Sequence, residues 1–202
     1  MNHCLKFVSG LFVFSLFLVN ALFAQPWVFV RESEGIKIYT RHEKNSSIKA
    51  FKGEAVFHSP VGKVFSLLAN EKDFSWWDKD ATYIKVLAYE ENKFIRYYFI
   101  YHLSWPLRDR DIAVDSRITI DPRTGERIIM SRPLPGIVPE KPGLIRINKY
   151  WQKWTVRPID KSNVTVILEG FIDPGGNLPS WLTNVTIPET PLRILRSLRA
   201  AL

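Results

Sequence analysis

The stretch from Tyr97 to Ile112 constrains the fold of this chain more than any other segment. Alternate side chains of a strand point to opposite faces, and here both faces are apolar. One face carries Tyr97, Phe99, Tyr101, Leu103 and Trp105, and the other carries Tyr98, Ile100 and His102. A strand with one face in solvent would carry charges on that face. The pattern therefore predicts a strand between two apolar layers, or between a helix and a cavity, and it leaves open which face is the inner one.

A second strand follows after a short interruption. Pro106 cannot donate to a strand ladder, so the first strand should end before it. From Arg110-Asp111 onward, one face carries Ile112, Val114, Ser116, Ile118 and Ile120, and the positions between them are mostly polar. This alternation predicts a strand with one buried face.

The N-terminus has the features of a secretory signal. Lys6 precedes an apolar run from residue 7 to 19, and small residues and Pro26 follow it. We expect residues 1–24 to be a signal peptide and residues 25–202 to be one domain. The alternative is an uncleaved N-terminal anchor, and in either case the protein should be exported, to a periplasm or outside the cell.

The single cysteine, Cys4, lies inside this N-terminal segment. A domain without cysteine has no disulfide, no thiolate nucleophile and no cysteine-based zinc site. Its stability must come from burial of a core, which a chain of this length can supply. Export without disulfides favours a bacterial periplasm.

The rest of the chain indicates an α+β domain in which strands dominate. Ser59-Pro60 is typical of a helix start, and Leu192, Leu195 and Leu198 have helical spacing near the C-terminus. Pro188 and Pro191 should bend that final helix into two segments. Further strands are predicted at residues 36–41, 48–57, 83–89, 128–132, 144–157 and 164–173.

A loop rich in proline and glycine spans residues 133–143, so it cannot be the interior of a helix or strand. Its apolar residues are unusual for a solvated loop. Leu134, Ile137 and Val138 are therefore candidates for a lid over an opening, together with Leu107.

Three motifs resemble a known family. Trp105-Pro106 followed by Arg110-Asp111, then the segments 141–146 and 173–184, resemble in order the motifs of the START family, the steroidogenic acute regulatory protein-related lipid-transfer domains. The resemblance covers residues 27–202. It implies a helix-grip fold, in which a curved antiparallel sheet wraps around a C-terminal helix and leaves an internal apolar cavity. It also implies binding of a lipid or sterol-like ligand.

Aromatic residues and a few polar ones are the candidates for lining that cavity. They are Trp76, Trp77, Tyr97, Tyr98, Phe99, Tyr101, His102, Trp105, Ser116, Met130 and Trp154. Several members of the family carry a charged pair in the cavity at positions that fall near Tyr98 and Ser116, where this chain has none. Arg110 and Asp111 are expected to form a structural ion pair at the start of their strand and to satisfy loop carbonyls there; the alternative is a contact with the ligand.

Composition and motifs narrow the partners. The formal charge is +8, but the basic residues are dispersed and no nucleic-acid-binding consensus is present, so nucleic acid is not expected. Transient contact with anionic lipid headgroups is compatible with this charge. No histidine pair has metal-ligand spacing, and we expect neither metal nor cofactor, in a protein that is monomeric.

Three functional hypotheses follow. The first is a non-enzymatic carrier of a lipid or sterol-like molecule. The second is an enzyme on the same scaffold, a cyclase, dehydratase or hydrolase, with Tyr101, His102 or Asp111 as acid–base candidates. The third is a surface interaction module, which would have a filled core.

Overall fold

The computed structural model describes residues 25–77 and 80–202. The predicted signal peptide, residues 1–24, lies outside the described residues. None of the helices in the described part is both long enough and apolar enough to cross a membrane.

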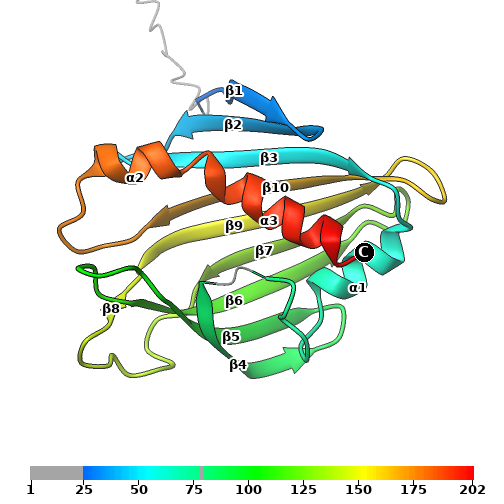
Figure 1. Ribbon diagram of the computed structural model, residues 1–202. Helices are drawn as coiled ribbons and strands as arrows, with labels where there is room; N and C mark the ends of the chain where they lie inside the picture. Colours follow the sequence, from blue (N-terminus) through cyan, green and yellow to red (C-terminus); the bar gives the residue numbers. More distant parts are fainter. Residues whose placement is uncertain (1–24, 78–79) are drawn as a thin grey trace, which may run out of the picture.

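The described chain forms ten strands and three helices (Figure 1). In chain order these elements are β1 (Val28–Ser33), β2 (Ile36–His42), β3 (Lys49–Phe57), α1 (Val61–Leu68), β4 (Ala81–Glu90), β5 (Phe94–Tyr101), β6 (Arg110–Ile120), β7 (Arg127–Pro133), β8 (Ile145–Arg146), β9 (Lys149–Pro158), β10 (Val164–Asp173), α2 (Ser180–Thr186) and α3 (Glu189–Ala200).

All ten strands belong to one curved sheet. Its order is β1-β2-β3-β10-β9-β7-β6-β5-β4, with antiparallel neighbours throughout, and the short β8 pairs in parallel with the start of β6. The fold is thus α+β of the helix-grip type, with the C-terminal helix lying across the sheet (Figure 1).

Helix α3 packs against β2, β3 and β10 through one apolar face. Its buried side chains are Pro191, Leu192, Ile194, Leu195 and Leu198, which lie on one side of a 3.6-residue helix. Gly53 of β3 permits this close approach. A Cβ at Gly53 would lie 2.7 Å from Leu195 Cδ1 and 2.8 Å from Pro191 Cβ.

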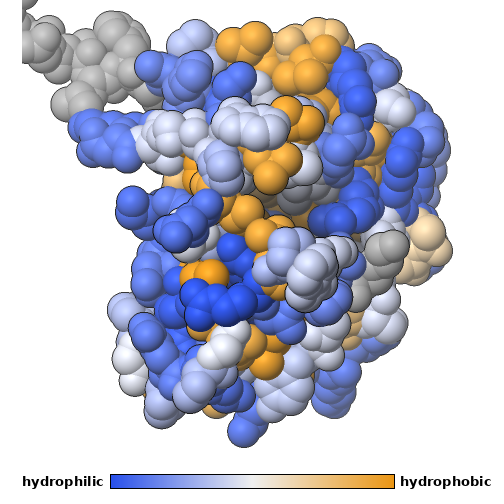
Figure 2. All heavy atoms as spheres, turned by 60° about the vertical axis from the view of Figure 1, so that its left-hand side comes forward, coloured by the Kyte–Doolittle hydropathy of each residue, from blue (hydrophilic) through white to orange (hydrophobic). Residues whose placement is uncertain are grey.

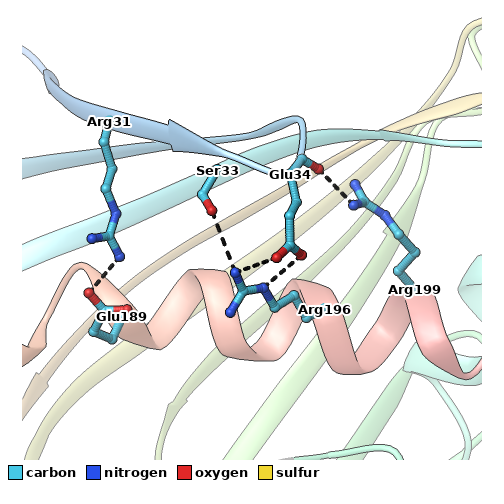
Figure 3. Close-up of polar contacts among 6 residues, drawn as sticks. All are labelled: Arg31, Ser33, Glu34, Glu189, Arg196 and Arg199. Atoms are coloured by element: carbon cyan, nitrogen blue, oxygen red, sulfur yellow. Dashed lines mark hydrogen bonds and ion pairs between the residues drawn. The ribbon is translucent and has the colours of Figure 1, made fainter.

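The outer face of α3 is held by the β1–β2 hairpin (Figure 3). Arg196 binds both carboxylate oxygens of Glu34, at 2.8 and 2.6 Å, and Arg199 donates to the Glu34 carbonyl at 2.8 Å. Arg31 of β1 pairs with Glu189 at 2.5 Å. These side chains are about half exposed, so each pair contributes little to stability, but together they fix how the hairpin lies on the helix.

Most predicted elements are confirmed, including the bend near Pro188, which separates α2 from α3. Pro191 lies in the first turn of α3, where a missing N–H is tolerated. Two predictions were wrong. His102, Leu103 and Trp105 lie beyond the end of β5, and the long strand expected over residues 144–157 is divided into β8 and β9. β1 was not predicted, because its side chains are largely exposed and give no alternation.

Candidate functional site

Two apolar pockets lie on the face of the sheet that α3 covers, and Phe99 lines both. The inner pocket, of about 30 Å³, is lined by Leu67, Leu68, Phe74, Trp76, Trp77, Ile84, Ile95, Tyr97, Phe99, Ser116, Ile129, Ser131 and Trp154. The outer pocket, of about 150 Å³, is lined by Phe99, Tyr101, Leu103, Arg110, Ile112, Ile147, Tyr150, Ile172, Pro174, Thr190 and Arg193. The inner face of β5 is therefore the one that carries Tyr97, Phe99 and Tyr101.

Three tryptophans form one wall of the inner pocket. The ring of Trp76 lies 5.1 Å from that of Trp77 and 6.3 Å from that of Trp154. The Trp77 indole N–H donates to the Tyr101 hydroxyl at 3.3 Å. The Trp76 indole N–H is buried and has no acceptor among the described residues. It is one of the few polar groups among the residues that line this pocket.

Three hydroxyl groups form the other polar feature of the inner pocket. Ser116 Oγ lies 2.7 Å from Ser131 Oγ and 3.3 Å from the Tyr97 hydroxyl. Burial raises the pKa of Tyr97, so this group stays neutral. Ser116 was predicted as a lining residue, whereas Ser131 was not. A signal for Ser131 existed, since it alternates with Ile129 on the apolar face of β7.

The outer pocket combines apolar walls with two arginines, Arg110 of β6 and Arg193 of α3. Arg193 is paired with Asp80 at 3.0 Å. Tyr150 also faces this space, its hydroxyl donates to Gln152 Oε1 at 3.2 Å, and burial raises its pKa.

Arg110 and Asp111 do not form the expected ion pair with each other. Adjacent residues of a strand point to opposite faces, so the two side chains meet different partners. Arg110 donates to three backbone carbonyls, those of Arg108, Pro174 and Gly175. The Asp111 carboxylate instead lies on the face of the sheet opposite to α3 and to both pockets, which we call the outer face.

Asp111 belongs to a buried cluster with Arg146 and Tyr98. Both carboxylate oxygens accept from Arg146 at 2.9 Å, and the Tyr98 hydroxyl donates at 2.8 Å. Burial opposes ionisation of Asp111, but the hydrogen bonds from Arg146 and Tyr98 outweigh it and hold the pKa of this carboxyl below its usual value. Burial, and then the bond to Asp111, raise the pKa of Tyr98 to about 12.

The predicted lid loop packs on this outer face. Arg146 donates to the carbonyls of Val138 and Pro139, and the Lys141 ammonium lies 5.0 Å from the centre of the Tyr98 ring. Leu134, Ile137 and Val138 therefore line neither pocket. Leu107 lines a surface groove beside Arg110, which is formed with residues 176–178.

Four other predicted lining residues lie elsewhere. Tyr98 and Met130 are on the outer face, because Phe99 and Ser131, their strand neighbours, face inward. His102 is largely exposed and contacts Asp109 at 3.1 Å. Trp105 is 92% exposed, since β5 ends at Tyr101.

Residues 25–77 and 80–202 contain no group of three His, Cys, Asp or Glu side chains that could hold an ion. What the site offers is an apolar surface, a few neutral hydrogen-bonding groups and two guanidinium groups.

The sequence is similar to a family model and to several known proteins. A family model described as the START domain matches residues 16–202. An uncharacterized protein of Pseudomonas aeruginosa is 28% identical over 183 residues, which are 90% of this chain and 89% of that protein. The phosphatidylcholine transfer protein of Rattus norvegicus is 26% identical over 171 residues, 81% of this chain and 78% of that protein.

Solved structures agree in fold. The crystal structure of a STAR-related lipid transfer protein from Xanthomonas axonopodis has a TM-score of 0.79 and 28% sequence identity to this chain. The match covers 87% of this chain and 97% of that structure.

Proposed function

The chain belongs to the START domain family, and from this premise we propose that it binds a lipid between α3 and the sheet and carries it without catalysing a reaction. The relatives that are named as lipid transfer proteins support the binding or transfer of a lipid. The two apolar pockets that meet at Phe99 carry the proposal.

The two pockets are small for a ligand site, so binding of a lipid requires side chains to move. Spaces of about 30 and 150 Å³ are smaller than the roughly 300–1,000 Å³ typical of ligand sites. A lipid chain would have to displace the Phe99 ring to join the two pockets. Burial of the chain, at about 25 cal/mol per Å² of apolar surface, would favour that rearrangement.

The lining of the pockets supports a carrier rather than an enzyme. None of the described residues that line the two pockets is His, Asp or Glu. Of the acid–base candidates, only Tyr101 reaches a pocket, while His102 is exposed and Asp111 lies on the outer face. Proton transfer within the pockets thus has no group that titrates near neutral pH.

Neutral groups at the inner pocket suit an uncharged ligand oxygen. The hydroxyls of Ser116, Ser131 and Tyr97 and the indole N–H of Trp76 can each bind an ester or hydroxyl oxygen. An apolar ligand would leave the Trp76 donor without an acceptor, at a cost of about 1 to 3 kcal/mol.

Transient contact with a bilayer is the second part of the proposal. Trp105, Trp181 and Val185 are 92%, 68% and 69% exposed, and they lie at the end of the sheet where residues 106–108 face residues 176–178. Figure 2 shows apolar side chains among hydrophilic ones on the side that contains this end. Exposed aromatic residues of this kind suit a lipid interface.

Export is the third part, supported only by the composition of residues 1–24. The expected result is that the purified protein from its native cells begins near residue 25 and fractionates with the periplasm or the medium. A mature N-terminus at Met1 in the cytoplasm would contradict it.

Native mass spectrometry of the purified domain, followed by lipid extraction, tests the proposed function. A defined lipid should co-purify, and it should leave unchanged in covalent structure when acceptor vesicles are added. Leu103→Trp, which fills the outer pocket, should lower lipid occupancy, whereas His102→Trp beside it should not. An empty protein that binds no acyl or sterol probe, or a chemically altered lipid, would contradict the proposal.

A further inference from the structure

Arg110 is a buried cation that forms no ion pair with any of the described residues. The residue is only 3% exposed, and its three hydrogen-bond acceptors are backbone carbonyls. Among the described residues, no carboxylate lies within ion-pair distance of its guanidinium. Burial, and next the charge of Arg108, lower the pKa of Arg110, and the charge of Asp109 opposes them in part; arginine remains protonated at neutral pH. Carbonyls satisfy N–H groups but do not neutralise the charge.

A matched case within the same protein shows what a neutralised arginine looks like. The Arg146 side chain is 10% exposed and binds both oxygens of Asp111 at 2.9 Å. Buried charges in proteins are usually paired in this way. Arg110 lies next to Asp111 in sequence, but the strand directs it to the opposite face.

The position of Arg110 gives its charge a direction. Its side chain lines the outer pocket on one side and the surface groove with Leu107 on the other. Three bonds to carbonyls use three of its five N–H groups, one from each nitrogen. Each terminal nitrogen thus keeps one N–H, and a fork of this kind fits a carboxylate or a phosphate.

Arg110 gives the outer pocket its uncompensated positive charge. Arg193 also lines this pocket, but it is paired with Asp80 at 3.0 Å, and no acidic residue is among the described lining residues. The remaining walls are mostly apolar, and Phe99 separates this pocket from the uncharged inner pocket, which it also lines. Charge is thus found at the outer pocket, and only neutral side chains line the inner one.

We propose that the outer pocket holds the anionic group of an amphiphilic ligand, a carboxylate or phosphate attached to an acyl chain, on Arg110 and Arg193. This inference rests on the proposed lipid-binding function and names the class of ligand. The acyl chain extends past Phe99 toward Trp76 and Trp154. A sterol or other neutral lipid leaves the Arg110 charge without a counter-ion and binds more weakly.

Binding of a fluorescent polyene fatty acid and of its methyl ester tests this assignment, at a pH where the acid is ionised. The wild-type protein should bind the acid about tenfold or more tightly than the ester, the scale of a charge-assisted hydrogen-bond pair. In Arg110→Gln the ratio of the affinity for the acid to that for the ester should fall toward one. Arg110→Lys should keep part of the preference, and Arg193→Gln should lower it.

The control variant is Arg123→Gln, which removes an equal charge from an 89% exposed side chain beyond the other end of β6. It should leave the acid-to-ester ratio unchanged. A ratio near one in the wild type, or a ratio that survives in Arg110→Gln, overturns the inference. Should Arg110→Gln fail to fold, the wild-type ratio and Arg193→Gln still decide.

Two further outcomes separate this inference from its premise. If neither acid nor ester binds, the proposed lipid-binding function fails, and this inference falls with it. If the ester binds as tightly as the acid, lipid binding stands and only the anion site is overturned. Displacement of the acid by inorganic phosphate that leaves the ester bound would assign the arginines to a free anion and overturn the lipid assignment.

Discussion

The two faces of the sheet treat buried charge differently. On the outer face, the carboxylate of Asp111, the guanidinium of Arg146 and the hydroxyl of Tyr98 satisfy one another. On the inner face, Arg110 has only carbonyl partners and lies beside a pocket. A face whose polar groups are complete contributes to stability, whereas a face with unused donors and free space is suited to a ligand.

Removing one member of the outer cluster should have the largest effect on stability. Asp111→Ala leaves Arg146 buried without its counter-ion, and we expect the free energy of unfolding to fall by about 3 to 5 kcal/mol. Urea titration followed by circular dichroism measures it. The double variant Asp111→Ala, Arg146→Ala should be less destabilised than the sum of the two single variants. A loss below about 1 kcal/mol for Asp111→Ala would mean that the two faces do not differ as described.

The inner face should be sensitive to added volume instead. Gly53→Ala places a Cβ against Leu195 and Pro191, and the displaced α3 should cost about 2 to 3 kcal/mol, the upper range for an overpacked core. Thermal unfolding and lipid occupancy should both decline. Gly62→Ala is the control, because nothing lies within 4 Å of its new Cβ and a helical position favours alanine. Equal stability of Gly53→Ala and wild type would contradict the packing of α3 on β3.

Two adjacent tyrosines allow the sharpest comparison of the faces. Tyr98→Phe removes a bond to a carboxylate and should cost about 1.5 kcal/mol, with no change in lipid binding. Tyr97→Phe removes only a 3.3 Å contact with Ser116, so its stability should change less, by under about 1 kcal/mol. Its lipid affinity should change, because it faces the inner pocket. The comparison fails if Tyr98→Phe alters ligand affinity more than Tyr97→Phe does.

The smallest effect should appear only in alkaline solution. Because folding raises the pKa of Tyr98 from 10.0 to about 12, the folded protein keeps a proton that the unfolded chain releases. Its contribution is complete below pH 10 and is lost as the pH rises through about 12. Melting temperatures of wild type and Tyr98→Phe should therefore converge over that interval. A gap that stays constant up to pH 12 would show that Tyr98 is not the group responsible.

Titration of Asp111 should change the stability of the protein in acid solution. The pKa of Asp111 is lowered in the folded protein, so its contribution is present above the usual carboxyl pKa of 3.8 and is lost as the pH falls below it. The Asp111→Asn variant has no carboxyl group to titrate at this position. Its stability should therefore fall less than that of the wild type as the pH is lowered.

The periodicity of the sequence predicted the sheet and the final helix well, because local alternation records which side chains are buried. It could not decide between the two faces of β5, since both are apolar and the choice depends on where α3 packs. It also assigned the loop at residues 133–143 to a lid, because apolar loop residues look alike whichever face they cover. Arg146, which holds that loop, was visible only as part of a motif.

The polar partners within the site were the hardest to predict. Ser116 and Ser131 meet only through the register of β6 with β7, and Asp111 and Arg146 only through the short parallel pair of β6 with β8. Both contacts join residues that are distant in sequence, so no local pattern indicates them. Family resemblance pointed to Ser116 but not to the hydroxyl group beside it.

The packing of α3 on β2 and β3 has a consequence for how the chain folds. The helix that covers the apolar face of the sheet follows all ten strands in the described chain, and its contacts on Gly53 join residues that are far apart in the sequence. Contacts of such long separation form slowly. Until Leu192, Leu195 and Leu198 are in place, the apolar face of β3 and β10 stays uncovered. We therefore expect a variant that lacks α3 to aggregate more readily than the wild type.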